Sequence, residues 1–247
     1  MKNKKSNIKV FDAKTMLLSD KSPFSVQEAY KTLRTNVSFS LPGTGCKCIG
    51  IVSANRGDGK SSIASNLSIS LAQLNKRVVL VDCDLRLPTI AKKFDVRSTP
   101  GLSNYLSGGV TEIPVIHEES RGLDIIPPGN IPPDSTTLIS SKEMIDMVKE
   151  LKQTYDYIVF DFPPINIVSD AMLLSDIIDG YLVVVRQDSS EYQMVEETIR
   201  QMRFADAKVI GFVYNGKGSV KKYYKRNYYK NYKYYSYYKK SSTTEKQ

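Results

Sequence analysis

One segment of ten residues limits the possible fold more than any other part of the chain. It reads SANRGDGKSS, spans residues 53–62, follows the apolar run CIGIVS and precedes a helical pattern. Its spacing matches the phosphate-binding loop G-x-x-x-x-G-K-[ST], except that Ala54 stands in place of the first glycine. That position serves a turn, which alanine can also fill. A strand, this loop and a helix in succession predict an α/β fold that binds a nucleotide.

The residues of this loop each have a chemical use. Backbone N–H groups would close around phosphate oxygens, helped by Gly57, Gly59 and the positive end of the helix that starts near Lys60. The Lys60 ammonium would bridge phosphate oxygens, and the Ser61 hydroxyl would ligate Mg²⁺. The predicted nucleotide-binding residues are Asn55, Arg56, Gly57, Asp58, Gly59, Lys60, Ser61 and Ser62.

The remaining pattern predicts the architecture. After Lys47, short β-branched runs alternate with helical segments, and the runs are continuously apolar, as strands buried on both faces require. An amphipathic helix that opens at Ser22-Pro23 comes before them. We therefore predict a mostly parallel sheet of the P-loop NTPase fold, covered by helices on both faces. The predicted strands are CIGIVS, RVVLVD, LDIIP, YDYIVFD, GYLVVV and KVIGFVYN, and the later helices run through Leu74, over 141–152, near 170–177 and over 191–204.

Two acidic clusters follow predicted strands. Asp82 and Asp84 come after VVLV, and Asp161 comes after YIVF. Ligands of open α/β sheets bind in the crevice at the carboxyl ends of the strands, where these carboxylates would lie. Asp161 is therefore the predicted Walker B acid, which holds Mg²⁺ directly or through water. One of Asp82 and Asp84 is expected to face the metal or the nucleophile, and the other would do so after a turn or would cap a helix.

The last thirty-one residues have a composition that no packed fold explains. They hold nine of the sixteen tyrosines and ten Lys or Arg against the single acid Glu245, so the whole net charge of +9 lies there. The tyrosine doublets match neither the helical nor the strand period. We interpret residues 217–247 as a disordered tail that is a substrate or ligand. Its tyrosines are Tyr223, Tyr224, Tyr228, Tyr229, Tyr232, Tyr234, Tyr235, Tyr237 and Tyr238.

Composition and length set the remaining limits. Residues 23–216 can bury the core of one domain, preceded by a polar extension over 1–22. The apolar runs are too short to span a membrane, and no secretory signal is visible, so a cytoplasmic protein is expected. Cys46, Cys48 and Cys83 are interpreted as reduced thiols, and His117 is expected in a surface loop.

Several motifs in a fixed order resemble one family. SPFSVQEAYKTLRTN, the phosphate-binding loop, DCDLR, GLSNYLSG, PPGNIPPD, YDYIVFDFPPI and IGFVYN span about residues 22–215. DCDLRLP resembles the Walker A′ motif of the bacterial tyrosine kinases, and the terminal tyrosine cluster matches them too. More narrowly, the chain is similar to the cytoplasmic CpsD/CapB-type kinases of capsular and exopolysaccharide synthesis.

The resemblance implies an activity and a set of site residues. It implies an ATP- and Mg²⁺-dependent tyrosine kinase that phosphorylates its tail tyrosines in trans and regulates polysaccharide synthesis or export. The implied catalytic residues are Lys60, Asp82, Asp84 and Asp161, with Mg²⁺ held by Ser61, Asp82 and Asp161. In the family the Walker A′ aspartates help to bind Mg²⁺ and activate the tyrosine hydroxyl.

The resemblance also implies partners. These are a membrane-anchored co-polymerase that activates the kinase, a cognate tyrosine phosphatase and other protein substrates. The family motif E-x-x-R-x-x-R, associated with ring-shaped assembly, appears as Glu28, Lys31 and Arg34, with Lys31 in place of the first arginine. That replacement keeps the charge and loses the bidentate fork, so weaker assembly is expected. A solvated helix face is the alternative interpretation of this spacing.

Two other classes of function remain as alternatives. A MinD/ParA-like ATPase switch shares the fold and the loop, but Asn55 stands where those proteins usually carry a signature lysine. The tail could instead tether the chain to nucleic acid or anionic lipid through stacked rings and lysines. Nucleic acid is not expected as the main partner.

Overall fold

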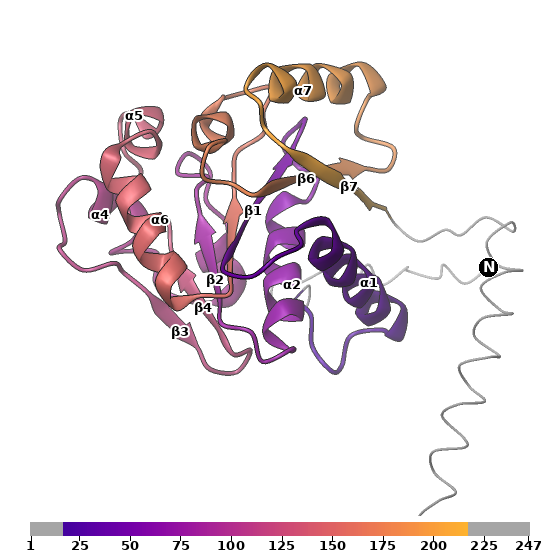
Figure 1. The fold of residues 1–247 in the computed structure, drawn as a ribbon, viewed down its shortest axis with the longest axis horizontal. Helices are drawn as coiled ribbons and strands as arrows, with labels where there is room; N and C mark the ends of the chain where they lie inside the picture. The colour runs from indigo at the N-terminus through magenta and orange to yellow at the C-terminus, as the bar shows by residue number, and fades with distance from the viewer. Residues whose placement is uncertain (1–16, 217–247) are drawn as a thin grey trace, which may run out of the picture. The chain divides into compact units, whose positions relative to one another are not determined.

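The computed structural model describes residues 17–216, in which a seven-stranded sheet lies between two layers of helices (Figure 1). The strand order is β3-β4-β2-β5-β1-β6-β7, and every neighbouring pair is parallel except β3 with β4. The mostly parallel P-loop fold predicted from the sequence is therefore confirmed. The strands are β1 (Lys47–Ser53), β2 (Val78–Asp82), β3 (Ile116–Glu118), β4 (Leu123–Ile126), β5 (Tyr157–Asp161), β6 (Gly180–Arg186) and β7 (Val209–Asn215).

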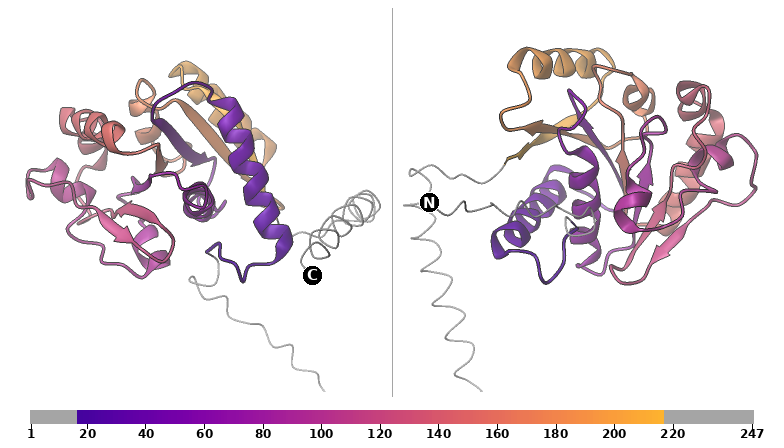
Figure 2. Two further views of the ribbon diagram at one scale, coloured as in Figure 1. Left: turned by 60° about the horizontal axis from the view of Figure 1, so that its bottom comes forward. Right: turned by 180° about the vertical axis from the view of Figure 1, so that it is seen from behind.

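The helices divide between the two faces of the sheet. One face packs against α1 (Phe24–Ser40), α2 (Lys60–Ala72) and α3 (Ile90–Phe94), and α1 lies beside α2 in each view of Figures 1 and 2. The helices on the other face are α4 (Leu102–Leu106), α5 (Ser135–Ile139), α6 (Lys142–Thr154), the 3-10 helix η2 (Asp170–Leu174) and α7 (Tyr192–Phe204). No helix within residues 17–216 is long and apolar enough to span a membrane.

Continuous burial explains why the central strands read as apolar runs. All residues of β2 are buried, as are all but the first of β1 and β5, because helices cover both faces. The parallel register pairs Asp82 with Asp161 and Ile51 with Asp161. The sheet therefore brings both acidic clusters to the carboxyl edge of the strands, next to the loop that follows β1.

Four features differ from the sequence predictions. The segment near 170–177 forms a 3-10 helix over Asp170–Leu174 instead of an α-helix. The predicted surface loop around His117 is wrong, because this residue lies in the antiparallel strand β3, although its side chain is 75% exposed and contacts Asp124 at 2.6 Å. Five-residue helices such as α3 were not predicted, because five residues are too few to show a helical period. The segment 1–22, predicted to be a polar extension, contains Leu17 and Leu18, which are buried in the core.

Candidate active site

The loop between β1 and α2 is shaped by glycines and closed by two residues far along the chain. Gly57 and Gly59 have φ values of +87° and +101°, a left-handed conformation that favours glycine. A Cβ added at Gly59 would lie 2.1 Å from Asn215 Nδ2, and that amide donates a hydrogen bond of 2.8 Å to the Asp58 carbonyl. Arg186 donates to the Gly57 carbonyl from the neighbouring strand. The ends of β6 and β7 therefore hold the loop in place.

Six successive backbone N–H groups of this loop are available to a ligand. The N–H groups of residues 56–61 donate no hydrogen bond to any other residue within 17–216. The two end residues of the predicted nucleotide-binding segment 55–62 have paired N–H groups. Asn55 N–H donates to Asp58 Oδ2 at 3.1 Å, and Ser62 N–H donates to the Gly59 carbonyl at 3.0 Å. Unpaired amides at the start of a helix bind phosphate oxygens well.

Lys60, Asp84 and Asp161 meet at this loop. Lys60 is buried, and its Nζ lies 4.0 Å from Asp84 Oδ2. Asp84 lines a cavity of about 400 Å³ together with the loop, and its Oδ1 accepts a hydrogen bond of 3.1 Å from Leu87 N–H. Asp161 is fully buried, and neither of its carboxylate oxygens has a hydrogen-bond partner. A buried carboxylate without partners is costly unless a cation compensates it.

Asp82 occupies a different position from Asp84. Its Oδ1 accepts a hydrogen bond of 3.2 Å from Asp84 N–H, and its Oδ2 accepts one of 3.1 Å from Ile90 N–H at the start of α3. Asp82 is fully buried and does not line the cavity. Of the two Walker A′ aspartates, Asp84 is therefore the one that faces the cavity, and Asp82 holds the segment that presents it.

Burial is the largest cause of the raised pKa values of these three carboxyl groups. Burial raises the pKa of Asp161 to about 6. The nearby Lys60 ammonium and Ser61 hydroxyl lower this pKa, but burial has the larger effect. Burial also raises the pKa of Asp84, with Lys60 opposing it. The pKa of Asp82 lies well above its usual range because of burial and then because of Asp161. A bound divalent cation would relieve this crowding.

These residues fit a Mg²⁺ ion bound together with a nucleotide. Within residues 17–216 no group of three or more His, Cys, Asp or Glu residues is placed to hold a metal ion by itself. Mg²⁺ usually binds through one or two carboxylates, water and substrate phosphates, so it needs no such cage. Asp161 and Ser61 are the protein groups best placed to hold it, because Asp161 is unpaired and Ser61 lines the cavity.

Further cations line this cavity beside Lys60. Lys93 donates a hydrogen bond of 3.0 Å to Ser62 Oγ, and burial lowers its pKa. Arg86 lines the cavity, donates to Thr136 Oγ1 at 3.1 Å and lies 3.9 Å from the buried carboxylate of Asp170. Thr136 donates to Asp170 Oδ1 at 2.8 Å. Only the tertiary structure reveals this arrangement, since α5 and η2 supply two of the three residues.

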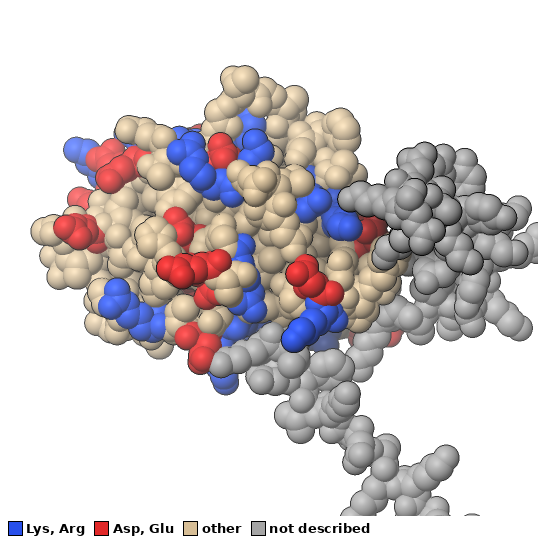
Figure 3. All heavy atoms as spheres, turned by 90° about the horizontal axis from the view of Figure 1, so that it is seen from below, with Lys and Arg blue, Asp and Glu red and all other residues tan. Residues whose placement is uncertain are grey.

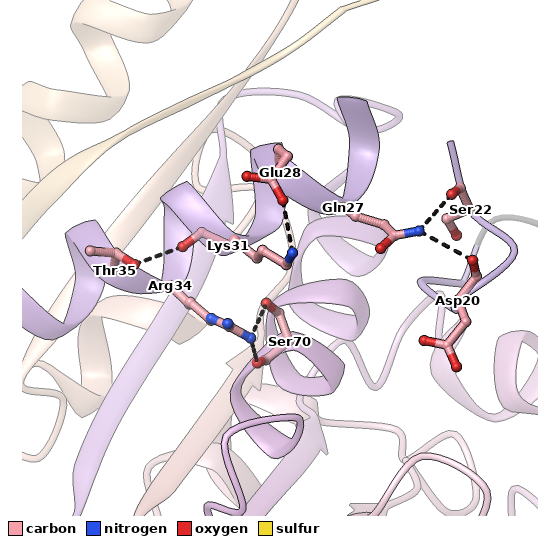
Figure 4. A network of polar contacts seen from close by, with 8 residues as sticks. All are labelled: Asp20, Ser22, Gln27, Glu28, Lys31, Arg34, Thr35 and Ser70. Atoms are coloured by element: carbon pink, nitrogen blue, oxygen red, sulfur yellow. Dashed lines mark hydrogen bonds and ion pairs between the residues drawn. The ribbon is translucent and has the colours of Figure 1, made fainter. Parts of the chain in front are cut away.

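The predicted assembly residues lie on α1 (Figure 4). Glu28 and Lys31 form an exposed ion pair of 2.8 Å within the chain. Arg34 instead points toward α2 and donates to the Ser70 carbonyl at 2.6 Å, so it joins the two helices. In this single chain Glu28 and Lys31 form a solvated face, and Arg34 has a structural use that the motif did not indicate. The nine tail tyrosines lie outside the described residues.

Comparison with known proteins places the chain in a family. Residues 46–243 match the family described as ParA, NUBPL iron-transfer P-loop NTPase. The chain is 35% identical to the tyrosine-protein kinase YwqD of Bacillus subtilis over 82% of this chain and 85% of that protein. It is 33% identical to the tyrosine-protein kinase CpsD of Streptococcus agalactiae over 76% and 82%.

Solved structures agree with this assignment. The chimerical protein CapA2B2 has a TM-score of 0.76 at 32% identity, over 83% of this chain and 90% of that one. The kinase domain of the Escherichia coli tyrosine kinase ETK has a TM-score of 0.75 at 29% identity, over 78% and 76%. MinD from Pyrococcus horikoshii, at 23% identity and a TM-score of 0.59 over 70% and 71%, shares the fold alone. The chain therefore belongs to the bacterial tyrosine-protein kinases, a branch of the ParA-type P-loop NTPases.

Proposed function

We propose that this tyrosine kinase uses ATP and Mg²⁺ to phosphorylate the tyrosines of its own segment 217–247 in trans, and that this modification regulates the synthesis or export of a capsular or extracellular polysaccharide. The observation that carries the proposal is the position of Asp84. Its carboxylate faces the cavity that the phosphate-binding loop lines and lies 4.0 Å from Lys60 Nζ. A general base is thus next to the place where a phosphoryl group would be transferred.

The residues of the site divide the work. The free N–H groups of residues 56–61 and the Lys60 ammonium hold phosphate oxygens and stabilise the charge that develops on them during transfer. Bound ATP supplies the phosphoryl group, and Mg²⁺ held by Ser61 and Asp161 neutralises charge. Asp84 accepts the proton of the tyrosine hydroxyl, whose unperturbed pKa is about 10. Burial raises the pKa of Asp84, which makes it a stronger base.

One wall of the cavity suits a phenol ring. Leu87, Pro163, Pro164 and Ile167 line the cavity together with the loop, and Leu87 and Ile167 are 50% and 61% exposed. Phosphate groups gain no binding energy from apolar side chains, whereas a tyrosine ring buries apolar area against them. This wall supports an acceptor that carries an aromatic ring.

Assembly and recruitment follow from the same proposal. Delivery of one tail to another active site requires self-association, for which Glu28, Lys31 and Arg34 on α1 are the proposed surface. Relatives include a putative kinase in the cps region of Klebsiella pneumoniae. By analogy, we place the chain in the cytoplasm at the inner face of the membrane, bound to a membrane-anchored co-polymerase. A tyrosine phosphatase would remove the phosphates from its tail.

The test is the intact mass and anti-phosphotyrosine signal of the protein before and after ATP and Mg²⁺. Phosphate additions within 217–247 are expected in the parent and not in Lys60→Met. A chain lacking 217–247 is expected to phosphorylate the Lys60→Met tail in trans. Hydrolysis of ATP with no phosphotyrosine, even after addition of the cytoplasmic segment of a co-polymerase, would favour a MinD-like switch instead.

A further inference from the structure

A second cavity lies at the opposite end of the sheet from the phosphate-binding loop. It has a volume of about 520 Å³ and is built where β1, β2 and β5 begin, whereas the active-site loop follows the last residue of β1. Figure 3 views the molecule from below, and Lys and Arg side chains lie among Asp and Glu side chains on that face. The active site described above makes no use of this cavity.

Four cations and one carboxylate line this basic cavity. The cations are Lys47, Lys76, Arg77 and Lys152, and the carboxylate is Asp156. Asp156 is already engaged, because its Oδ2 accepts a hydrogen bond of 2.8 Å from Arg77 N–H and its Oδ1 lies 3.8 Å from Arg77 Nη2. The cavity therefore keeps an excess of positive charge that no described side chain neutralises.

The lysines of the basic cavity have only neutral partners. Lys47 Nζ donates to the Pro42 carbonyl at 3.1 Å, and Lys152 Nζ donates to the Ile177 carbonyl at 3.3 Å. Each ammonium has three donors, so both keep donors free. Lys76 is exposed and makes no ion pair with a described residue. An anion would find several unused donors here.

The loop at the edge of the cavity adds backbone donors. In the segment Pro42-Gly43-Thr44-Gly45-Cys46, both glycines have positive φ, +100° and +90°. The N–H groups of residues 43–46 donate to no other residue within 17–216. A Cβ on Gly43 would lie 3.7 Å from Lys47 Nζ, so the ammonium lies next to these amides. Successive free amides beside a cation form a typical anion-binding concavity.

An aromatic ring completes the basic cavity. Tyr157 lines it, and its hydroxyl lies 3.4 Å from Ser38 Oγ. Pro42 also lines the cavity. A ligand that presents a phosphate to the cations and a ring to Tyr157 and Pro42 would use all of these groups.

We infer that the basic cavity binds phosphotyrosine, the product of this kinase, in the tail of the same or a second copy of the chain. The inference rests on the proposed phosphorylation of segment 217–247. That segment carries ten Lys or Arg against one acid, so a basic cavity repels its unmodified form. Each phosphate adds about −1.5 to −2 charges and supplies the anion that the cavity selects. Thirty-one extended residues span roughly 100 Å, which is ample length.

The test uses the full-length Lys60→Met chain, so that its own tail stays unmodified. The probe is a fluorescent synthetic peptide of residues 228–238 phosphorylated on Tyr234 and Tyr235, and its unphosphorylated form is the first control. Binding by anisotropy is expected to be at least about tenfold tighter for the phosphorylated peptide and to weaken as salt rises. Reversing the charge of two exposed residues, Lys76→Glu with Arg77→Glu, is expected to weaken it by about tenfold or more.

A matched control and two competing ligands make the result specific. Lys142→Glu with Lys149→Glu reverses two exposed charges on α6 outside the cavity and is expected to leave binding unchanged. Free phosphotyrosine is expected to compete better than inorganic phosphate, because only phosphotyrosine has a ring that can contact Tyr157 and Pro42. Anionic phosphatidylserine vesicles are expected not to compete at moderate salt.

Several outcomes would overturn the inference. The inference is wrong if both peptides bind with equal affinity, or if Lys76→Glu with Arg77→Glu has no effect on binding. It is also wrong if ADP and Mg²⁺ displace the peptide, because the peptide then lies in the active site. Vesicles that bind through these residues while the peptide does not would identify a membrane surface instead. The synthetic probe carries its phosphates already, so failure here is distinct from failure of the parent enzyme to phosphorylate its tail.

Discussion

Replacing Asp161 with asparagine is expected to stabilise the ligand-free protein while abolishing phosphoryl transfer. Asp161 is fully buried, neither carboxylate oxygen has a hydrogen-bond partner, and burial raises its pKa to about 6 from 3.8. The folded state therefore binds the proton more tightly than the unfolded state does. Stability from this group is complete below about pH 3.8 and is lost as the pH rises through about 6.

The magnitude follows from the size of the shift. A difference of about two pKa units, at about 1.4 kcal/mol each, makes the charged carboxylate cost up to about 3 kcal/mol of unfolding free energy above pH 6. An asparagine side chain at this position would carry no charge and would avoid this cost. For a domain of this size, 1 kcal/mol corresponds to roughly 2–4 °C, so Asp161→Asn is expected to raise Tm by up to about 10 °C at pH 7.5.

The assay is thermal and urea unfolding from pH 4.5 to 8 in the presence of EDTA. The gain of Asp161→Asn over the parent should grow between pH 4.5 and 7 and then level off. Asp176→Asn, which changes an exposed acid, should show no such trend. ATP with Mg²⁺ should stabilise the parent more than the variant, since the variant lacks the metal ligand. A variant no more stable than the parent at pH 7.5, or a gain that does not depend on pH, would refute the reasoning.

Three further substitutions test other parts of the site. Asp84→Asn is expected to lower tyrosine phosphorylation by at least about a hundredfold while nucleotide binding, followed by fluorescent ADP, changes little, because Asp84 is the proposed base; unchanged kinetics would exclude that role. Gly59→Ala is expected to lose nucleotide affinity and about 1 kcal/mol or more of stability, since its Cβ would meet Asn215 at positive φ; calorimetry and urea unfolding measure both, and a neutral result would contradict the loop geometry. Lys31→Arg, which restores the family motif, is expected to increase the assembled fraction in light scattering; an unchanged mass distribution would argue against α1 as the assembly surface.

The local part of the active site could be predicted from the sequence because it is contiguous. The strand CIGIVS, the loop through Lys60 and the helix after it follow one another, and Asp82 and Asp161 directly end strands. Burial on both faces made those strands continuous apolar runs, so their positions were readable. Short elements such as α3 and β3 were missed because three to five residues carry no periodic signal.

The sequence by itself determined that this chain is a parallel α/β protein with a phosphate-binding loop and acids at the strand ends, because each of these features depends on neighbours along the chain. The tertiary structure alone separated Asp84, which faces the cavity, from Asp82, which accepts the Ile90 amide. It also brought Asn215 to the loop across 157 residues and formed the basic cavity from three separate stretches of the chain. Contacts between residues so far apart depend on strand order and packing, and no local pattern encodes them.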